Sequence, residues 1–132
     1  MNKGKFIITK RALTKKISPG KEDLSACGNV NAKENYEEAA KRELFEETGI
    51  ECPLNLLVNF YEEVDSQNID NKKLKYFCSV FLGETDQEPK FNDEIMLFRR
   101  LTKEEIEKEI VETPEKFCQG FINDFNKIKD KL

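Results

Sequence analysis

The 132-residue sequence contains no histidine and no tryptophan. Without an imidazole the chain cannot form a Ser-His-Asp or Cys-His catalytic arrangement, and it cannot carry a H-E-x-x-H zinc site. It also lacks the side chain that most readily titrates near neutral pH. Any acid–base catalysis must therefore use carboxylates, lysine, tyrosine or a metal-bound water.

The sequence has four cysteines, and they are widely separated: Cys27, Cys52, Cys78 and Cys118. There is no C-x-x-C pair and no histidine to complete a zinc tetrahedron, so we expect no structural zinc site. The sequence also lacks a secretory-type apolar leader and any apolar run near the ~20 residues that span a membrane. We expect a cytoplasmic protein with reduced thiols and no membrane partner.

Acidic and basic residues are nearly balanced: 26 acidic and 22 basic residues give a net charge of -4. This balance gives no strong electrostatic reason to expect a nucleic acid polymer as partner. Ten phenylalanines and three tyrosines are enough to fill a core. With no repeat, linker or low-complexity segment, residues 1–132 are expected to form a single domain.

Local patterns predict strands and helices in irregular alternation. A helix is expected from Asn35 to Thr48, with Asn35 as N-cap, Glu38 closing a capping box and Gly49 just beyond the end. Strands are predicted at 6–9, 54–64, 74–82 and 95–101, and further helices at 103–111, capped by Thr102, and 115–129, opened by Pro114. This order favours an α/β fold in which helices cover a mixed β-sheet.

Two helical faces are notable. The last helix places apolar side chains on one face: Phe117, Phe121, Phe125 and Ile128. The helix at 35–48 is expected to pack through an apolar stripe: Tyr36, Ala40 and Leu44. The sequence predicts that its acidic residues lie opposite this stripe.

Those acidic residues are Glu43, Glu46 and Glu47, at spacing i, i+3 and i+4, which brings three carboxylates close together. Like charges at this spacing destabilise an isolated helix by roughly 0.2–0.5 kcal/mol per pair. They also lie near the helix C-terminus, where the dipole disfavours negative charge. A hard cation such as Mg²⁺ or Mn²⁺ relieves the repulsion, whereas the alternative is a solvated acidic face.

The whole segment 28–50 resembles the Nudix box, G-x5-E-x7-R-E-U-x-E-E-x-G-U, where U is a bulky aliphatic residue. All nine specified positions agree at the required spacing: Gly28, Glu34, Arg42, Glu43, Leu44, Glu46, Glu47, Gly49 and Ile50. The resemblance implies a Nudix-type α/β/α sandwich and a metal-dependent hydrolase that cleaves the pyrophosphate bond of a nucleoside diphosphate-linked or similar small diphosphate.

The resemblance also assigns roles within the box. It implies that Glu43, Glu46 and Glu47 bind Mg²⁺ or Mn²⁺, with the backbone carbonyl of Gly28 as a further ligand. Arg42 and Glu34 are implied to orient these carboxylates. The metal neutralises the diphosphate and activates a water, and with imidazole absent a glutamate is the natural general base.

Outside the box the chain is similar to the isopentenyl-diphosphate isomerase branch of the same family. The segments that carry this likeness are Arg11–Lys16, Pro19-Gly20, Cys27-Gly28, Asn92–Met96 and Pro114–Phe117. Isomerisation is therefore an alternative activity, and a non-catalytic Nudix-fold binding module is another. Asn29 replaces the histidine after C-G, and Leu74 and Tyr76 stand where that branch has its E-x-E pair, so hydrolysis is favoured.

Three residues outside the box are further site candidates. Glu94 lies in a region from which some family members supply an extra metal ligand or the general base. Arg11 and Lys16 are candidates for binding substrate phosphates. The chain begins close to the strand at 6–9, so the resemblance implies a sheet trimmed at the N-terminus, whose open edge a homodimer would cover.

Overall fold

The computed structural model describes residues 4–16, 18–26, 30–65 and 73–132 and contains two antiparallel sheets. The first sheet has the strand order β2-β1-β5, formed by β1 (Phe6–Arg11), β2 (Glu22–Asp23) and β5 (Ile95–Leu101). The second sheet pairs β3 (Leu54–Asp65) with β4 (Lys73–Gly83). The predicted strands are therefore all present, and β2 is an additional short one.

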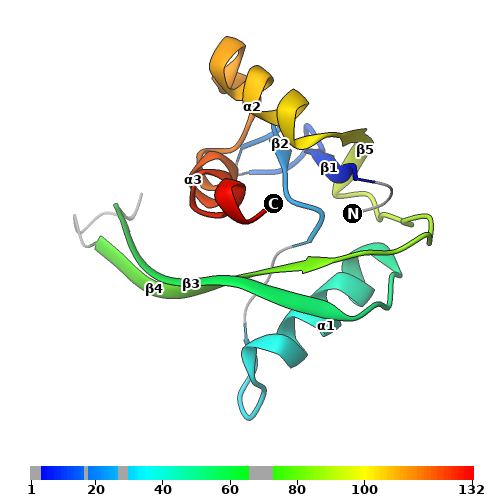
Figure 1. Ribbon diagram of the computed structural model, residues 1–132, viewed down its shortest axis with the longest axis vertical. Coiled ribbons are helices and arrows are strands. Elements are labelled where there is room, and N and C mark those ends of the chain that lie inside the picture. The colour runs from blue at the N-terminus through cyan, green and yellow to red at the C-terminus, as the bar shows by residue number, and fades with distance from the viewer. Residues whose placement is uncertain (1–3, 17, 27–29, 66–72) are drawn as a thin grey trace.

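Three α-helices accompany the sheets: α1 (Tyr36–Thr48), α2 (Lys103–Glu112) and α3 (Gln119–Ile128). In Figure 1, α1 lies on one side of the β3–β4 pair and α3 lies on the other. Both helices contact β3, which makes a helix–sheet–helix arrangement. The α/β class is confirmed. None of the helices in the described part of the chain is long and apolar enough to cross a bilayer.

The strand pairing differs from the expected mixed sheet. Every ladder among the described strands is antiparallel, and the parallel component is one isolated bridge between Glu22 and Phe117. Consecutive strands such as β3 and β4 pair antiparallel because a short connection can form a hairpin, whereas parallel pairing needs a long crossover connection. The strands β2 and β5 are the edges of the three-stranded sheet, and a homodimer across such an edge stays a prediction.

The main core lies between the first sheet and the C-terminal helices. Its buried members are Ile8, Leu101, Ile106, Phe117, Cys118, Phe121 and Phe125. The apolar face predicted for the last helix is confirmed, since all four of its residues are buried. The helix itself begins only at Gln119, because the backbone N–H of Cys118 donates to the carbonyl of Glu22 (2.9 Å) and holds this segment against β2.

The ends of α1 agree with the sequence patterns. Asn35 Oδ1 accepts a hydrogen bond from the backbone N–H of Glu38 (2.8 Å), and Gly49 has the left-handed φ of 72°. The Glu38 carboxylate accepts from the side-chain amide of Asn35 (3.1 Å), in place of the backbone bond of a full capping box. Both halves of the box are present at Thr102 and Glu105, where α2 begins.

The buried side of α1 differs from the predicted stripe. Tyr36 is 46% exposed, whereas Ala39 is buried. Four-residue steps along the helix lead from Ala39 to Glu43 and Glu47, which are both half-buried, so two of the glutamates lie on the covered side. The other two residues of the expected stripe are half-buried as well, so the carboxylates are not confined to the side opposite the packed face. The covered side carries carboxylates as well as small side chains.

Candidate functional site

Arg42 is the centre of the polar contacts on α1. Its Nε donates to Glu34 Oε2 (2.8 Å) and its Nη2 donates to Glu34 Oε1 (3.1 Å). This is the bidentate fork that guanidinium and carboxylate groups form, with geometric specificity as well as energy. Glu34 lies in the loop before the helix, so the pair fixes the loop to the second turn of α1.

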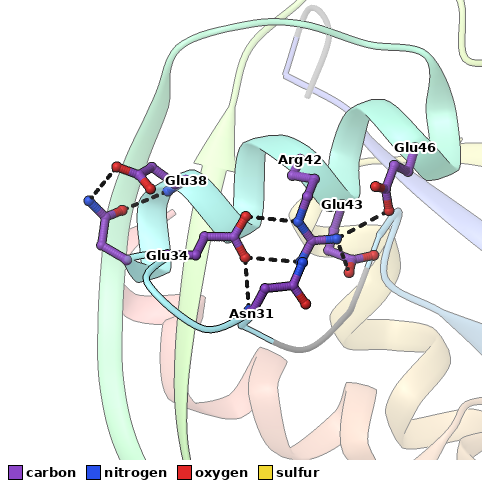
Figure 2. Close-up of polar contacts among 7 residues, drawn as sticks. Asn31, Glu34, Glu38, Arg42, Glu43 and Glu46 are labelled. Carbon is purple, nitrogen blue, oxygen red and sulfur yellow. Dashed lines mark hydrogen bonds and ion pairs between the residues drawn. The ribbon is translucent and has the colours of Figure 1, made fainter.

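The same guanidinium binds two glutamates of the acidic cluster. Arg42 Nη1 donates to Glu43 Oε1 (2.8 Å) and to Glu46 Oε2 (3.2 Å). Figure 2 shows the guanidinium between Glu34 on one side and Glu43 and Glu46 on the other. The repulsion expected from the spacing of the glutamates is thus relieved here by a cation within the helix. Glu43 is 19% exposed and Glu46 is 56% exposed.

Glu34 is further held by its own loop. Glu34 Oε1 accepts a hydrogen bond from the backbone N–H of Asn31 (2.9 Å), and Lys33 between them has the left-handed φ of 67°. The hydrogen bond from Arg42, followed by the one from Asn31, lowers the pKa of Glu34. The hydrogen bonds that Arg42 donates to Glu34 and Glu43 raise the pKa of Arg42. The loop therefore presents an ionised carboxylate that orients a permanently charged arginine.

The structure brings together part of the predicted metal set. Glu43 and Glu46 share Arg42, and Glu47 is half-buried on the same helix, whereas Gly28 lies outside the described residues. Within the described ranges, no group of three or more Asp, Glu, Cys or His side chains is drawn together as metal ligands. The donors are carboxylate oxygens alone, and this chemistry fits Mg²⁺ or Mn²⁺ rather than zinc or copper.

Arg11 and Lys16 line one surface depression together with Thr14 and Lys15. The backbone of this loop is held by hydrogen bonds from Arg11 N to Lys21 O (2.9 Å) and from Gly20 N to Arg11 O (3.0 Å). The two predicted phosphate-binding side chains are thus close to each other. Their substrate role stays a prediction.

Glu94 lies beside this basic loop. Its carboxylate is 3.4 Å from Lys15 Nζ, and its backbone carbonyl accepts from Ala12 N (2.9 Å). The side chain is 61% exposed. The contact places Glu94 beside the loop that carries the candidate phosphate ligands Arg11 and Lys16, and its role as metal ligand or base stays a prediction.

Asp23 was not singled out by the sequence patterns. Its Oδ2 lies 3.6 Å from Arg11 Nη1, so it is the acidic partner of a predicted substrate-binding residue. In the sequence Asp23 stands next to Glu22, and two adjacent acids indicate no more than a solvated pair. The contact with Arg11 follows from the pairing of β1 with β2, which brings Asp23 opposite Thr9 and which the sequence does not show.

Comparison with known proteins settles the family. The model of the NUDIX domain matches residues 1–121, which include the box, the basic loop and the first three residues of α3. This chain belongs to the Nudix family. The suspected resemblance is therefore confirmed.

The proteins similar to this Nudix protein include one named as an isomerase and one named as a MutT protein. The chain is 39% identical over 97 residues to isopentenyl-diphosphate Delta-isomerase 2 of Photorhabdus laumondii, covering 71% of this chain and 52% of the relative. It therefore spans about half the length of that relative. Among solved structures, it is similar to the MutT protein of Methanosarcina mazei Go1, with 25% identity, a TM-score of 0.71 and coverage of 98% of this chain and 86% of that one.

A second solved structure, the DR0079 protein of Deinococcus radiodurans, has 28% identity and a TM-score of 0.65, with coverage of 85% of this chain and 68% of that one. The two structures agree with the Nudix-type fold expected from the box.

Proposed function

We propose that this Nudix protein is a metal-dependent hydrolase that cleaves the pyrophosphate bond of a nucleoside diphosphate-linked or similar small diphosphate. The observation that carries the proposal is the convergence of Glu43 and Glu46 on one nitrogen of Arg42, at 2.8 and 3.2 Å. Carboxylates gathered around one positive charge on a helix are a donor set suited to a hard divalent cation.

Gly28 and the charged residues of the box each have a role in this proposal. Glu43, Glu46 and Glu47 are the candidate ligands, with Gly28 as the candidate backbone ligand. When bound, Mg²⁺ or Mn²⁺ supplies charge neutralisation of the diphosphate and activation of an attacking water. Arg42, held by the Glu34 fork, keeps the glutamate side chains in place.

The remaining steps fall to other side chains. A glutamate accepts the proton of the attacking water, because the chain has no imidazole. Glu46 and Glu47 are the candidates on α1, and Glu94 is the candidate beside the basic loop. Arg11 and Lys16 bind substrate phosphates, since a protein with net charge -4 needs local cations for an anionic ligand.

An isopentenyl-diphosphate isomerase-like activity is the second candidate, and the name of the Photorhabdus relative favours it. Against it, the two-sided proton transfer of an isomerase needs more than Cys27, and Leu74 and Tyr76 supply neither of the two carboxylates of the E-x-E pair. The intact set of box glutamates supports hydrolysis, and it also argues against a binding module without turnover.

A substrate panel separates these candidates by product. Purified protein with Mg²⁺ is incubated with nucleoside diphosphate sugars, dinucleoside polyphosphates, nucleoside triphosphates and isoprenoid diphosphates. We expect phosphate-bearing cleavage products from at least one nucleotide substrate and none after EDTA is added. Double-bond migration in an isoprenoid diphosphate, without cleavage of any substrate, would contradict the proposal.

A further inference from the structure

We propose that Asp23 is a positioning residue that holds the guanidinium of Arg11 in the orientation needed to bind a substrate phosphate. The proposal rests on the function proposed above, in which Arg11 binds substrate. Asp23 does not itself contact the substrate, because a carboxylate repels a phosphate. It acts through Arg11, and the geometry around both side chains supports this.

The two strands bring the side chains close together. Thr9 on β1 pairs with Asp23 on β2 in an antiparallel register. Arg11 is two residues beyond Thr9 and diagonally across from Asp23, a separation that a long side chain can span. The register of β1 against β5 shifts between Lys10 and Arg11, so the contact itself, rather than regular alternation, places the two side chains together. Arg11 Nη1 is 3.6 Å from Asp23 Oδ2, and each side chain is 23% exposed.

Asp23 is held firmly on its other side. Its Oδ1 accepts a hydrogen bond from the backbone N–H of Leu24 (2.8 Å). The hydroxyl of Thr9, which is 1% exposed, contacts the backbone oxygens of Asp23 (3.2 Å) and Leu24 (2.7 Å). One carboxylate oxygen is thus fixed by the backbone while the other faces Arg11. A fixed partner reduces the rotamer entropy that Arg11 loses when it binds a ligand.

The ionised carboxylate of Asp23 does not stabilise the fold at neutral pH. Burial raises the pKa of Asp23, and the opposing effects of Leu24, Arg11 and the Cys118 thiol do not offset it. An acid whose pKa is higher in the folded than in the unfolded protein destabilises the fold at pH values above both. At neutral pH the ionised carboxylate therefore has a cost, and a role at the basic loop explains why it is present.

The test compares wild type with Asp23→Asn, which keeps the acceptor for Leu24 and removes the charge. Glu88→Gln is the matched control, because it removes the carboxylate partner of a different arginine, Arg100, at 2.8 Å. Binding of inorganic pyrophosphate is measured by calorimetry. EDTA is present to remove divalent metal, so that the affinity reports the protein's own groups. KM and kcat for a diphosphate substrate and the thermal midpoint at neutral pH are measured on the same preparations.

We expect Asp23→Asn to weaken pyrophosphate binding and to raise KM by roughly fivefold, the upper end for a partly exposed ion pair. The kcat should stay close to that of wild type, and the thermal midpoint should be equal or higher. Glu88→Gln should change none of the binding values.

Three results would overturn the proposal. Unchanged pyrophosphate affinity and KM in Asp23→Asn mean that Arg11 needs no positioning. A lower thermal midpoint with parallel losses in kcat and affinity means a structural role. If wild type and Arg11→Ala bind pyrophosphate equally, the phosphate-binding role of Arg11 fails, and the role of Asp23 fails with it. That last result also separates a failure of the phosphate site from a failure of the positioning claim alone.

Discussion

At the scale of single residues, Arg42 is the most connected side chain of the box. It uses three nitrogens to bind three carboxylates, those of Glu34, Glu43 and Glu46. Lysine has the same charge but a single ammonium group, which cannot reproduce the planar fork. The arginine is therefore required for its geometry as well as for its charge.

We expect Arg42→Lys to lower both metal affinity and kcat by about 10- to 100-fold, the range typical for residues that orient metal ligands. Lys41→Gln is the control, because Lys41 lies on the same helix and forms an exposed i,i+4 pair with Glu37 (3.3 Å). Metal titration and steady-state kinetics on both variants check this. Full activity of Arg42→Lys would show that the fork with Glu34 is dispensable.

Glu46 and Glu47 carry the proposed metal and base roles, whereas Cys27 has none in a hydrolase. Glu46→Gln and Glu47→Gln keep side-chain size and remove the charge, so each should abolish most turnover. Cys27→Ala should retain turnover. Steady-state rates of the three variants are compared with wild type, and an active Glu46→Gln with an inactive Cys27→Ala would instead favour the isomerase.

The sequence predicts some of this site and misses the rest for physical reasons. The convergence of Glu43 and Glu46 on Arg42 follows from helical spacing, which is local. The contact between Arg11 and Asp23 depends on the register of two strands, and spacing along the chain does not report it. The Asn31 N–H bond to Glu34 likewise depends on a left-handed residue, Lys33, whose conformation its residue type does not predict.

At the scale of elements, α1 is defined by its caps more clearly than by its packed face. Asn35 and Gly49 mark its ends as the sequence predicts. The covered side could not be read from apolar spacing, because half-buried glutamates occupy part of it. A helix that packs fully through apolar residues would show the usual amphipathic pattern. The half-buried carboxylates of α1 obscure that pattern.

The left-handed turn at Gly49 gives a prediction about stability. A Cβ at Gly49 would meet no heavy atom within 4 Å, so only backbone strain opposes a substitution. Because φ is 72°, Gly49→Ala should lower the free energy of unfolding by about 1–2 kcal/mol.

Gly120 is the matched control for this change. It lies within α3, where a Cβ also meets nothing within 4 Å and the backbone is helical. Gly120→Ala should raise the free energy of unfolding by about 0.5–1 kcal/mol. Urea denaturation of both variants measures the difference, and equal effects of the two changes would contradict the assignment of strain to Gly49.

At the scale of the whole molecule, an ion-pair network joins distant segments. Arg99 on β5 binds the buried Glu22 of β2 through two bonds of 2.6 Å, and it also binds Glu109 of α2 (2.8 Å). Lys116, in the 3₁₀ turn Pro114–Lys116, also pairs with Glu109. The network connects the first sheet to the C-terminal helices beside the main core. Glu22 and Arg99 are 77 residues apart, so sequence spacing could not predict their contact.

Glu109 predicts how this network responds to pH. Burial raises the pKa of Glu109, but the hydrogen bonds and charges of Lys116 and Arg99 outweigh burial, so its pKa is lowered from the ordinary 4.5. A lowered acid pKa stabilises the fold above the unfolded pKa, and that stabilisation is lost as the pH falls through the folded pKa.

Glu109→Gln should therefore be less stable than wild type near pH 7, and the two proteins should become equally stable at acid pH. Denaturant unfolding of both proteins from pH 7 down to acid measures this convergence. A difference in stability that is independent of pH would contradict the role of the ionised carboxylate.

In the proposed reaction, water attacks phosphorus in a metal-dependent hydrolysis. The most direct measurement is turnover of a cleaved diphosphate in ¹⁸O-labelled water, with mass spectrometry of both products. We expect Mg²⁺-dependent incorporation of one ¹⁸O per cleavage, carried by a phosphate group of one product. No cleavage and no ¹⁸O in phosphate, together with double-bond migration in an isoprenoid diphosphate, would contradict it.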